Sequence, residues 1–76
     1  ATGDLAGAAE QYRRTAEKFP DFNLAGEYYL KAMECYGKAG NRDSARDIFG
    51  KISDDFQDTR YYMEGARLAA EHKIQL

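Results

Sequence analysis

Few residues in this chain have the types and spacing that catalysis requires. His72 is the only histidine and Cys35 the only cysteine. No arrangement along the sequence predicts a Ser-His-Asp or Cys-His set around them. We therefore expect His72 to face solvent near the end of a helix. Cys35 lies in an apolar-rich segment, which predicts a buried structural thiol, with a reactive or interchain thiol as the alternative.

The acidic residues also lack the pattern of a metal site. Asp54, Asp55 and Asp58 lie close together, but a calcium-binding loop would add a central glycine and a distal glutamate. We interpret the cluster as a helix end followed by the cap of the next helix. The sequence has no glycine-rich phosphate loop. These patterns predict a protein that is not an enzyme and that has no metal site and no cofactor.

Length and charge restrict the class of protein further. The 76 residues suit one small domain spanning 1–76. A net charge of -2 argues against a nucleic-acid or membrane-surface binder, which needs a basic face. No apolar stretch approaches the roughly 20 residues of a membrane span. We expect a cytoplasmic location, while a processed periplasmic protein, or an excised or designed piece of a larger one, remains open.

The apolar residues recur at helical spacing, and valine and tryptophan are absent, which favours helix over strand. We predict four helices over about 4–19, 24–39, 41–55 and 58–72, with no element assigned to the tail after them. The expected caps and stops are Asp4, Pro20, Asn23, Gly40, Asn41 or Asp43, and Asp58 or Thr59. The short link at Gly40 predicts an antiparallel hairpin.

Two stretches of the chain repeat one pattern. Residues 3–21 and 40–58 share small and aromatic positions at a spacing of 37, and Glu27-Tyr28-Tyr29-Leu30 returns as Arg60-Tyr61-Tyr62-Met63 at a spacing of 33. Such a period indicates stacked helical units that bury their apolar faces against one another. Gly65 beside Ala66 suggests a close approach of two helices, with simple tolerance of glycine as the alternative.

The adjacent tyrosine pairs divide between core and surface, because successive helix residues point about 100° apart. We expect Tyr29 and Tyr62 in the core and Tyr28 and Tyr61 partly exposed. Exposed tyrosines are common anchors of protein interfaces. Filling a gap against the next hairpin is the alternative role.

These motifs resemble the tetratricopeptide repeat, in which an A helix and a B helix alternate. Tyr29, Ala32, Met33 and Tyr36 occupy A-helix positions, Gly40 the turn, and Ala45 and Phe49 the B-helix positions. Ala8, Tyr12, Ala16 and Pro20 resemble an earlier B helix, and Tyr62, Gly65, Ala66 and Ala69 a second A helix. The chain departs from the family at Gln57, where proline is usual, and in lacking tryptophan. Related helical-hairpin families, such as the soluble NSF-attachment proteins and bacterial outer-membrane assembly lipoproteins, share this sequence pattern.

The resemblance implies an all-α fold of stacked hairpins in the order B-A-B-A and a protein-binding adaptor or scaffold. In the family the A helices line a groove, which here implies contacts from Arg60, Glu71 and the partner-binding candidates. The partner-binding candidates, which include the two tyrosines expected at the surface, are Glu27, Tyr28, Leu30, Glu34, Lys38, Tyr61, Met63 and Arg67. The expected partner is a peptide or helix of another protein. The alternative is a structural repeat that self-associates through its end helices and has no ligand of its own.

Overall fold

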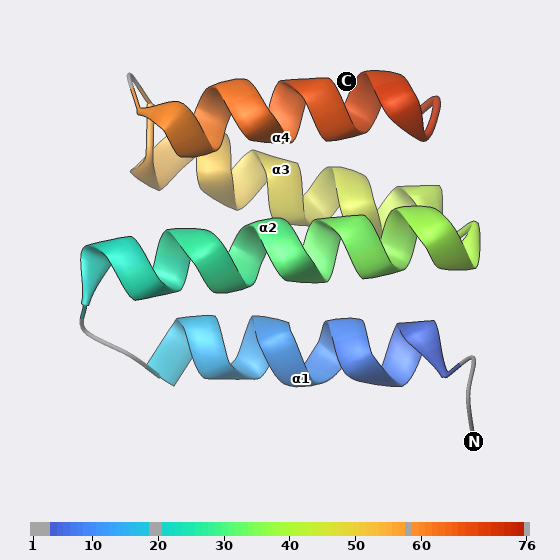
Figure 1. Cartoon of the computed structure of the whole chain (residues 1–76), viewed down its shortest axis with the longest axis horizontal. Coiled ribbons are helices and arrows are strands. Elements are labelled where there is room, and N and C mark those ends of the chain that lie inside the picture. Colours follow the sequence, from blue (N-terminus) through green and yellow to red (C-terminus); the bar gives the residue numbers. More distant parts are fainter. Residues whose placement is uncertain (1–3, 19–20, 58, 76) are drawn as a thin grey trace.

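The four helices run in alternating directions, so that consecutive helices are antiparallel (Figure 1). The computed structural model describes residues 4–18, 21–57 and 59–75. Its helices are α1 (Leu5–Lys18), α2 (Phe22–Ala39), α3 (Arg42–Asp55) and α4 (Arg60–Glu71), and no strand occurs in that described part. The predicted all-α hairpin fold is confirmed, and each predicted helix boundary lies within two residues of the observed one.

Side-chain caps fix the starts of three helices. The carboxylate of Asp4 accepts a hydrogen bond from the Gly7 amide at 3.0 Å, as predicted. Asp21 caps α2 by accepting from the Leu24 amide at 3.0 Å. The prediction of Asn23 as this cap is wrong, because the helix starts earlier and Asn23 lies within it. The predictions for Pro20 and Asp58 concern positions outside the described residues.

The connection between α2 and α3 is as short as predicted. Gly40 ends α2 with a φ of 81°, a left-handed conformation that costs glycine little. Asn41 follows at once and caps α3 through the Ser44 amide at 3.3 Å. Thr59 precedes α4 without a capping bond, since its hydroxyl donates to the Phe56 carbonyl instead. The two-residue link between α2 and α3 makes them an antiparallel hairpin.

Helix α2 is the centre of the molecule, because it packs against each of the other three helices. Most of the core lies on α2 and α3, whereas α1 contributes only small buried side chains. No helix in the described part of the chain is long and apolar enough to cross a membrane. The buried residues are Ala9, Ala16, Ala25, Tyr29, Leu30, Ala32, Met33, Tyr36, Ala45, Ile48, Phe49, Ile52, Phe56, Tyr61, Leu68, Ala69 and Ile74.

Two glycines of α2 make room for rings at the two ends of α4, Tyr61 in its first turn and His72 directly after it. A methyl group built at Gly26 would lie 2.7 Å from the Tyr61 ring, and one at Gly37 would lie 2.7 Å from the His72 ring. The two glycines are separated by eleven residues, and so are the two rings, which corresponds to about three helical turns. These two contacts fix the register of α2 and α4, which run parallel to each other (Figure 1).

Gly65 brings α4 close to α3 in the same way. A methyl group built there would lie 2.9 Å from the Phe49 ring, so the predicted close approach at Gly65 is confirmed. Gly50 differs, because nothing lies within 4 Å of a methyl group at that position. A neighbouring ring therefore requires glycine at positions 26, 37 and 65, whereas the fold merely tolerates Gly50.

The tail after α4 closes the helix with a Schellman motif. The Ile74 amide donates to the Ala69 carbonyl at 2.8 Å, and the Lys73 amide donates to the Ala70 carbonyl at 3.4 Å. Lys73 has a φ of 57°, which is unfavourable for a residue with a side chain. Ile74 is buried beside the core. The sequence did not assign this segment, because lysine rather than glycine occupies the left-handed position.

Replacing Lys73 with glycine should stabilise the protein. Glycine removes the steric cost of the left-handed conformation, so the free energy of unfolding should rise by about 1 kcal/mol. Urea unfolding measures the change. Lys73→Ala is the matched control, because it removes the charge and keeps the steric cost; an equal gain in both variants would contradict the explanation.

Two alanine substitutions test the packing of α2 against α4. Gly50→Ala should stabilise by up to about 1 kcal/mol through helix propensity alone. Gly26→Ala gains the same propensity but forces the Tyr61 ring to move, at a cost of about 1–3 kcal/mol, so it should lower the thermal unfolding midpoint. Stabilisation by both variants would show that α4 does not dock on α2 as described.

Candidate functional site

One ion pair joins the two helices on which the sequence predicted a binding groove. Arg60 at the start of α4 donates to the carboxylate of Glu27 on α2. The two residues are 33 apart, the period seen in the sequence. The Arg60 guanidinium also lies 4.5 Å from the centre of the Tyr61 ring. Its hydrogen bond to Glu27 raises the pKa of Arg60. These contacts bring the predicted residues of α2 and α4 together at this end of the helix pair.

The tyrosine pairs divide differently from the prediction on α4. Tyr29 is buried and Tyr28 is half-buried, as predicted. Tyr61, however, is only 4% exposed, whereas Tyr62 is 36% exposed, so the prediction for this pair is wrong. The reason is Gly26, which leaves a gap on α2 that the Tyr61 ring fills. The Tyr62 ring instead lies against Phe49 at 5.4 Å between centroids.

The two apolar groove candidates occupy different environments. Leu30 is 7% exposed and is a core residue, which corrects the expectation that it lines a surface groove. Met63 is 72% exposed. Because Met63 follows Tyr61 by two residues, it lies about 200° around α4 and faces away from α2. A segment lying on α2 would therefore not contact Met63 directly.

The charged candidates lie on solvent-exposed helix surfaces. Glu34 and Lys38 form an ion pair at 3.5 Å along α2. Arg67 pairs with Glu71 at 2.6 Å along α4. Exposed pairs of this kind contribute little to stability, so these residues remain available to exchange partners with another molecule.

Sequence reasoning missed three residues beside this surface. Tyr12 of α1 stacks on Tyr28 with ring centroids 6.0 Å apart. The ammonium group of Lys31 lies 6.0 Å from the Tyr12 ring centre, and Leu24 is 44% exposed. Leu24 and Lys31 share a helical face with Glu27, Glu34 and Lys38, a spacing that could have indicated them.

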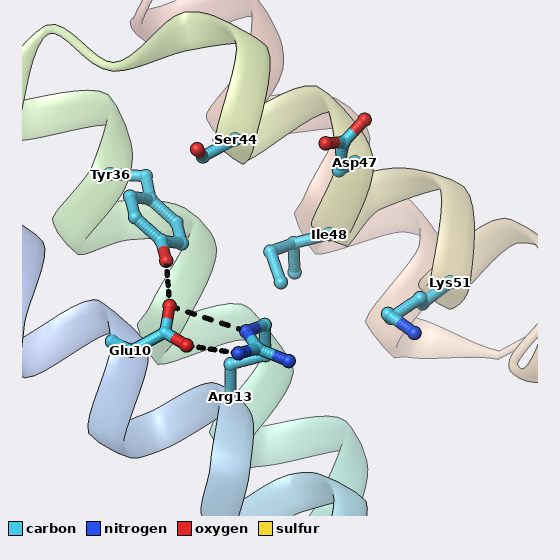
Figure 2. Close-up of a pocket in the computed structure, with 7 residues that line it drawn as sticks. All are labelled: Glu10, Arg13, Tyr36, Ser44, Asp47, Ile48 and Lys51. Atoms are coloured by element: carbon cyan, nitrogen blue, oxygen red, sulfur yellow. Dashed lines mark hydrogen bonds and ion pairs between the residues drawn. The ribbon is translucent and has the colours of Figure 1, made fainter.

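A separate cleft of about 290 Å³ lies between α1, α2 and α3, and Figure 2 shows the side chains around it. The Tyr36 hydroxyl donates to Glu10 at 2.7 Å, and Arg13 donates to Glu10 and to Glu17. Lys51 of α3 lies 3.7 Å from Glu17. The cleft is lined by Glu10, Arg13, Tyr36, Ser44, Asp47, Ile48 and Lys51.

The charges at this cleft form a polar link between helices. The hydrogen bond from Arg13, followed by that from Tyr36, holds the pKa of Glu10 at about 2, below its ordinary 4.5. Burial, followed by the hydrogen bond to Glu10, raises the pKa of Tyr36. Glu10 is therefore ionised and Tyr36 neutral near pH 7. The link attaches α1, which buries only Ala9 and Ala16, to the centre of the molecule.

Cys35 and His72 are both partly packed against other residues of the fold. Cys35 is half-buried, and burial raises the pKa of its thiol, which disfavours the reactive thiolate. The ring of His72 packs at Gly37, so the expectation that His72 faces solvent is only partly met. The backbone carbonyl of His72 accepts from Arg42 at 3.2 Å. Among the described residues, no group of histidine, cysteine, aspartate or glutamate side chains is arranged to hold a metal ion.

A comparison with protein families supports the fold and the repeat. Residues 27–59 match the family model described as Tetratricopeptide repeat. The matched segment covers most of α2, all of α3 and the turn into α4. Searches of the curated proteins and of the solved structures found no match.

The chain is a tetratricopeptide-repeat-like helical protein. Three observations agree on this class: the matched segment, the four antiparallel helices, and the packing of α2 against both α3 and α4. Repeats of this family generally mediate contacts between proteins and are typically not enzymes.

The polar link predicts a loss of stability in acid. Because Glu10 has a pKa of about 2 in the folded protein and an ordinary value of 4.5, its contribution is present above pH 4.5. That contribution should fall as the pH decreases from 4.5 through 2. Urea unfolding from pH 6 to 2 (a range chosen to bracket both values) should show a smaller decrease for Glu10→Gln than for the original chain. Equal decreases would contradict the assignment.

Proposed function

We propose that the chain is a protein-interaction module that binds a segment of a partner polypeptide across the exposed face of α2 and the adjoining edge of α4. The observation that carries the proposal is the position of α2. It is the A helix of the matched repeat and packs against each of the other three helices, yet one of its faces is uncovered in the described part of the chain. An uncovered face on a central helix is a rigid surface on which a partner can lie.

The residues of this face combine apolar and charged groups. Leu24, Glu27, Lys31, Glu34 and Lys38 follow one another at helical spacing along α2. Leu24 provides exposed apolar area, and the charges alternate in sign. The face thus offers one anchor for an apolar side chain and several groups that pair with either charge.

Both edges of the face add contacts from neighbouring helices. On the α1 side, the half-buried Tyr12 and Tyr28 rings stack, and tyrosine is enriched among residues that dominate binding energy. On the α4 side, Arg60 and Arg67 are more than half exposed. A partner segment with apolar side chains near the tyrosines and acidic side chains near the arginines fits this surface, as an amphipathic helix or an extended strand.

The fold keeps the cost of binding low. The face lies on helices whose register is fixed by rings packed at glycines, so little ordering is required when a partner binds. Surface ion pairs add little affinity, so the aromatic and apolar groups should supply most of it. The charges should mainly determine which segments bind and in which direction.

A peptide-display experiment tests this proposal. Random peptides selected on the chain are titrated against the labelled protein, and amide shifts should gather on α2 and the edge of α4. Exchanging the ion pair (Glu34→Lys with Lys38→Glu) should weaken binding about tenfold. The matched control exchanges an exposed pair on α3, Asp43 and Arg46, which lies 2.9 Å apart, and should leave binding unchanged.

Two results would contradict the proposal. Shifts that gather on α3 or around the cleft of Glu10 would place binding elsewhere. Equal effects of the two exchanges would show that the charges of α2 take no part. Circular dichroism of each variant confirms that the helices are retained.

A further inference from the structure

The outer side of α4 carries an apolar stripe that no described residue covers. Met63 is 72% exposed and Tyr62 36% exposed. The half-buried Ala66 and the exposed Ala70 continue the stripe at helical spacing. An open depression of about 600 Å³ adjoins this stripe and is lined by Gln57, Thr59, Arg60, Tyr62 and Met63. Contiguous exposed apolar residues of this kind mark interaction surfaces.

The internal repeat shows that this stripe has the pattern of a buried helix face. Shifting α2 by 33 residues superposes Tyr29 on Tyr62 and Leu30 on Met63. On α2 both positions are 7% exposed, and the Tyr29 ring packs edge-on against Phe56, which follows α3. The stripe on α4 therefore has side chains suited to packing against another helix.

A row of charged residues beside the apolar stripe is complementary to the same row on a second copy of α4. Arg60, Glu64, Arg67 and Glu71 lie on one side of α4, with signs that alternate along the helix. When a second copy of α4 lies antiparallel to the first, its row of charges runs in the opposite order. Arg60 then faces Glu71 of the second copy, and Glu64 faces Arg67 of the second copy. In a parallel pair related by a twofold axis, the two rows would lie on opposite sides of the interface and would not pair.

The sizes of the apolar side chains favour the same orientation. The large Tyr62 and Met63 lie in the first half of α4, and the small Ala66 and Ala70 lie in the second half. An antiparallel pair places Met63 over the alanines of the second copy, whereas a parallel pair places large residues against each other. Charge and shape are thus complementary between α4 and a second α4 related by a twofold axis.

We infer that two copies of this chain associate through an antiparallel pair of α4 helices, with Ala66 near the twofold axis, a Met63 on each side of it and the charge row at the rim. The carboxylates that already pair with Arg67 within α4, at 2.6 Å for Glu71 and 3.9 Å for Glu64, are shared across the interface. A contact limited to one helix of about 18 Å is small, so the dimer is weak and depends on concentration.

Sedimentation equilibrium over a range of concentrations of the whole chain tests the inference. The original chain should show a monomer–dimer equilibrium. Arg67→Glu places two pairs of glutamates in contact and should weaken dimerisation at least about tenfold. Adding Glu64→Arg to that variant recreates opposite charges across the antiparallel pair and should restore dimerisation.

The control is Arg46→Glu on α3, which also removes an exposed paired arginine and should not affect dimerisation. A chain that stays monomeric at every concentration would overturn the inference. So would equal dimerisation by Arg67→Glu, or a double variant that fails to recover while remaining helical. Exchange of Glu34 and Lys38 should leave the dimer intact, which separates this interface from the proposed partner-binding face.

Discussion

The packing of α4 onto α2 depends on two glycines of α2, Gly26 and Gly37, which have no side chain. Without a Cβ at Gly26 and Gly37, the Tyr61 and His72 rings lie directly against the α2 backbone. Since each glycine and its ring recur after three turns, the contact fixes both the distance and the register of the two helices. The exposed face of α2, the edge of α4 and the orientation of the outer α4 stripe all follow from this register. A helix in the same place but rotated by one residue would bury Tyr62 and expose Tyr61.

The two ends of the molecule are held by different forces. On the α4 side, Tyr61 packs on α2 at Gly26 and on Phe56 after α3, and Ile74 belongs to the same buried core. On the α1 side, small buried alanines leave little apolar contact, and the hydrogen bonds among Glu10, Arg13 and Tyr36 join α1 to the centre. The contact of α4 depends on the shape of the packed side chains, whereas the contact of α1 depends on the ionisation of Glu10. We therefore expect acid to act selectively on the attachment of α1. The proposed binding face lies between these two ends.

The sequence predicted the fold well because its signals are local. Helical spacing, the caps Asp4 and Asn41, and Gly40 in the turn were all confirmed. It failed where a contact between distant residues decides the outcome. The assignment of Tyr61 and Tyr62 followed the repeat, but the gap at Gly26 reverses it. Leu30 was predicted at the surface but is buried, on the same side of α2 as Gly26, where Tyr61 packs. Lys73 gave no sign of the left-handed conformation that precedes the buried Ile74.

A nuclear Overhauser experiment on the folded chain measures the contact between α2 and α4 most directly. We expect cross-peaks from the Gly26 α-protons to the Tyr61 ring and from the Gly37 α-protons to the His72 ring. Both are required, because together they define parallel helices in one register. Cross-peaks from Gly26 to the Tyr62 ring, or the absence of the Gly37–His72 peak, would contradict the account.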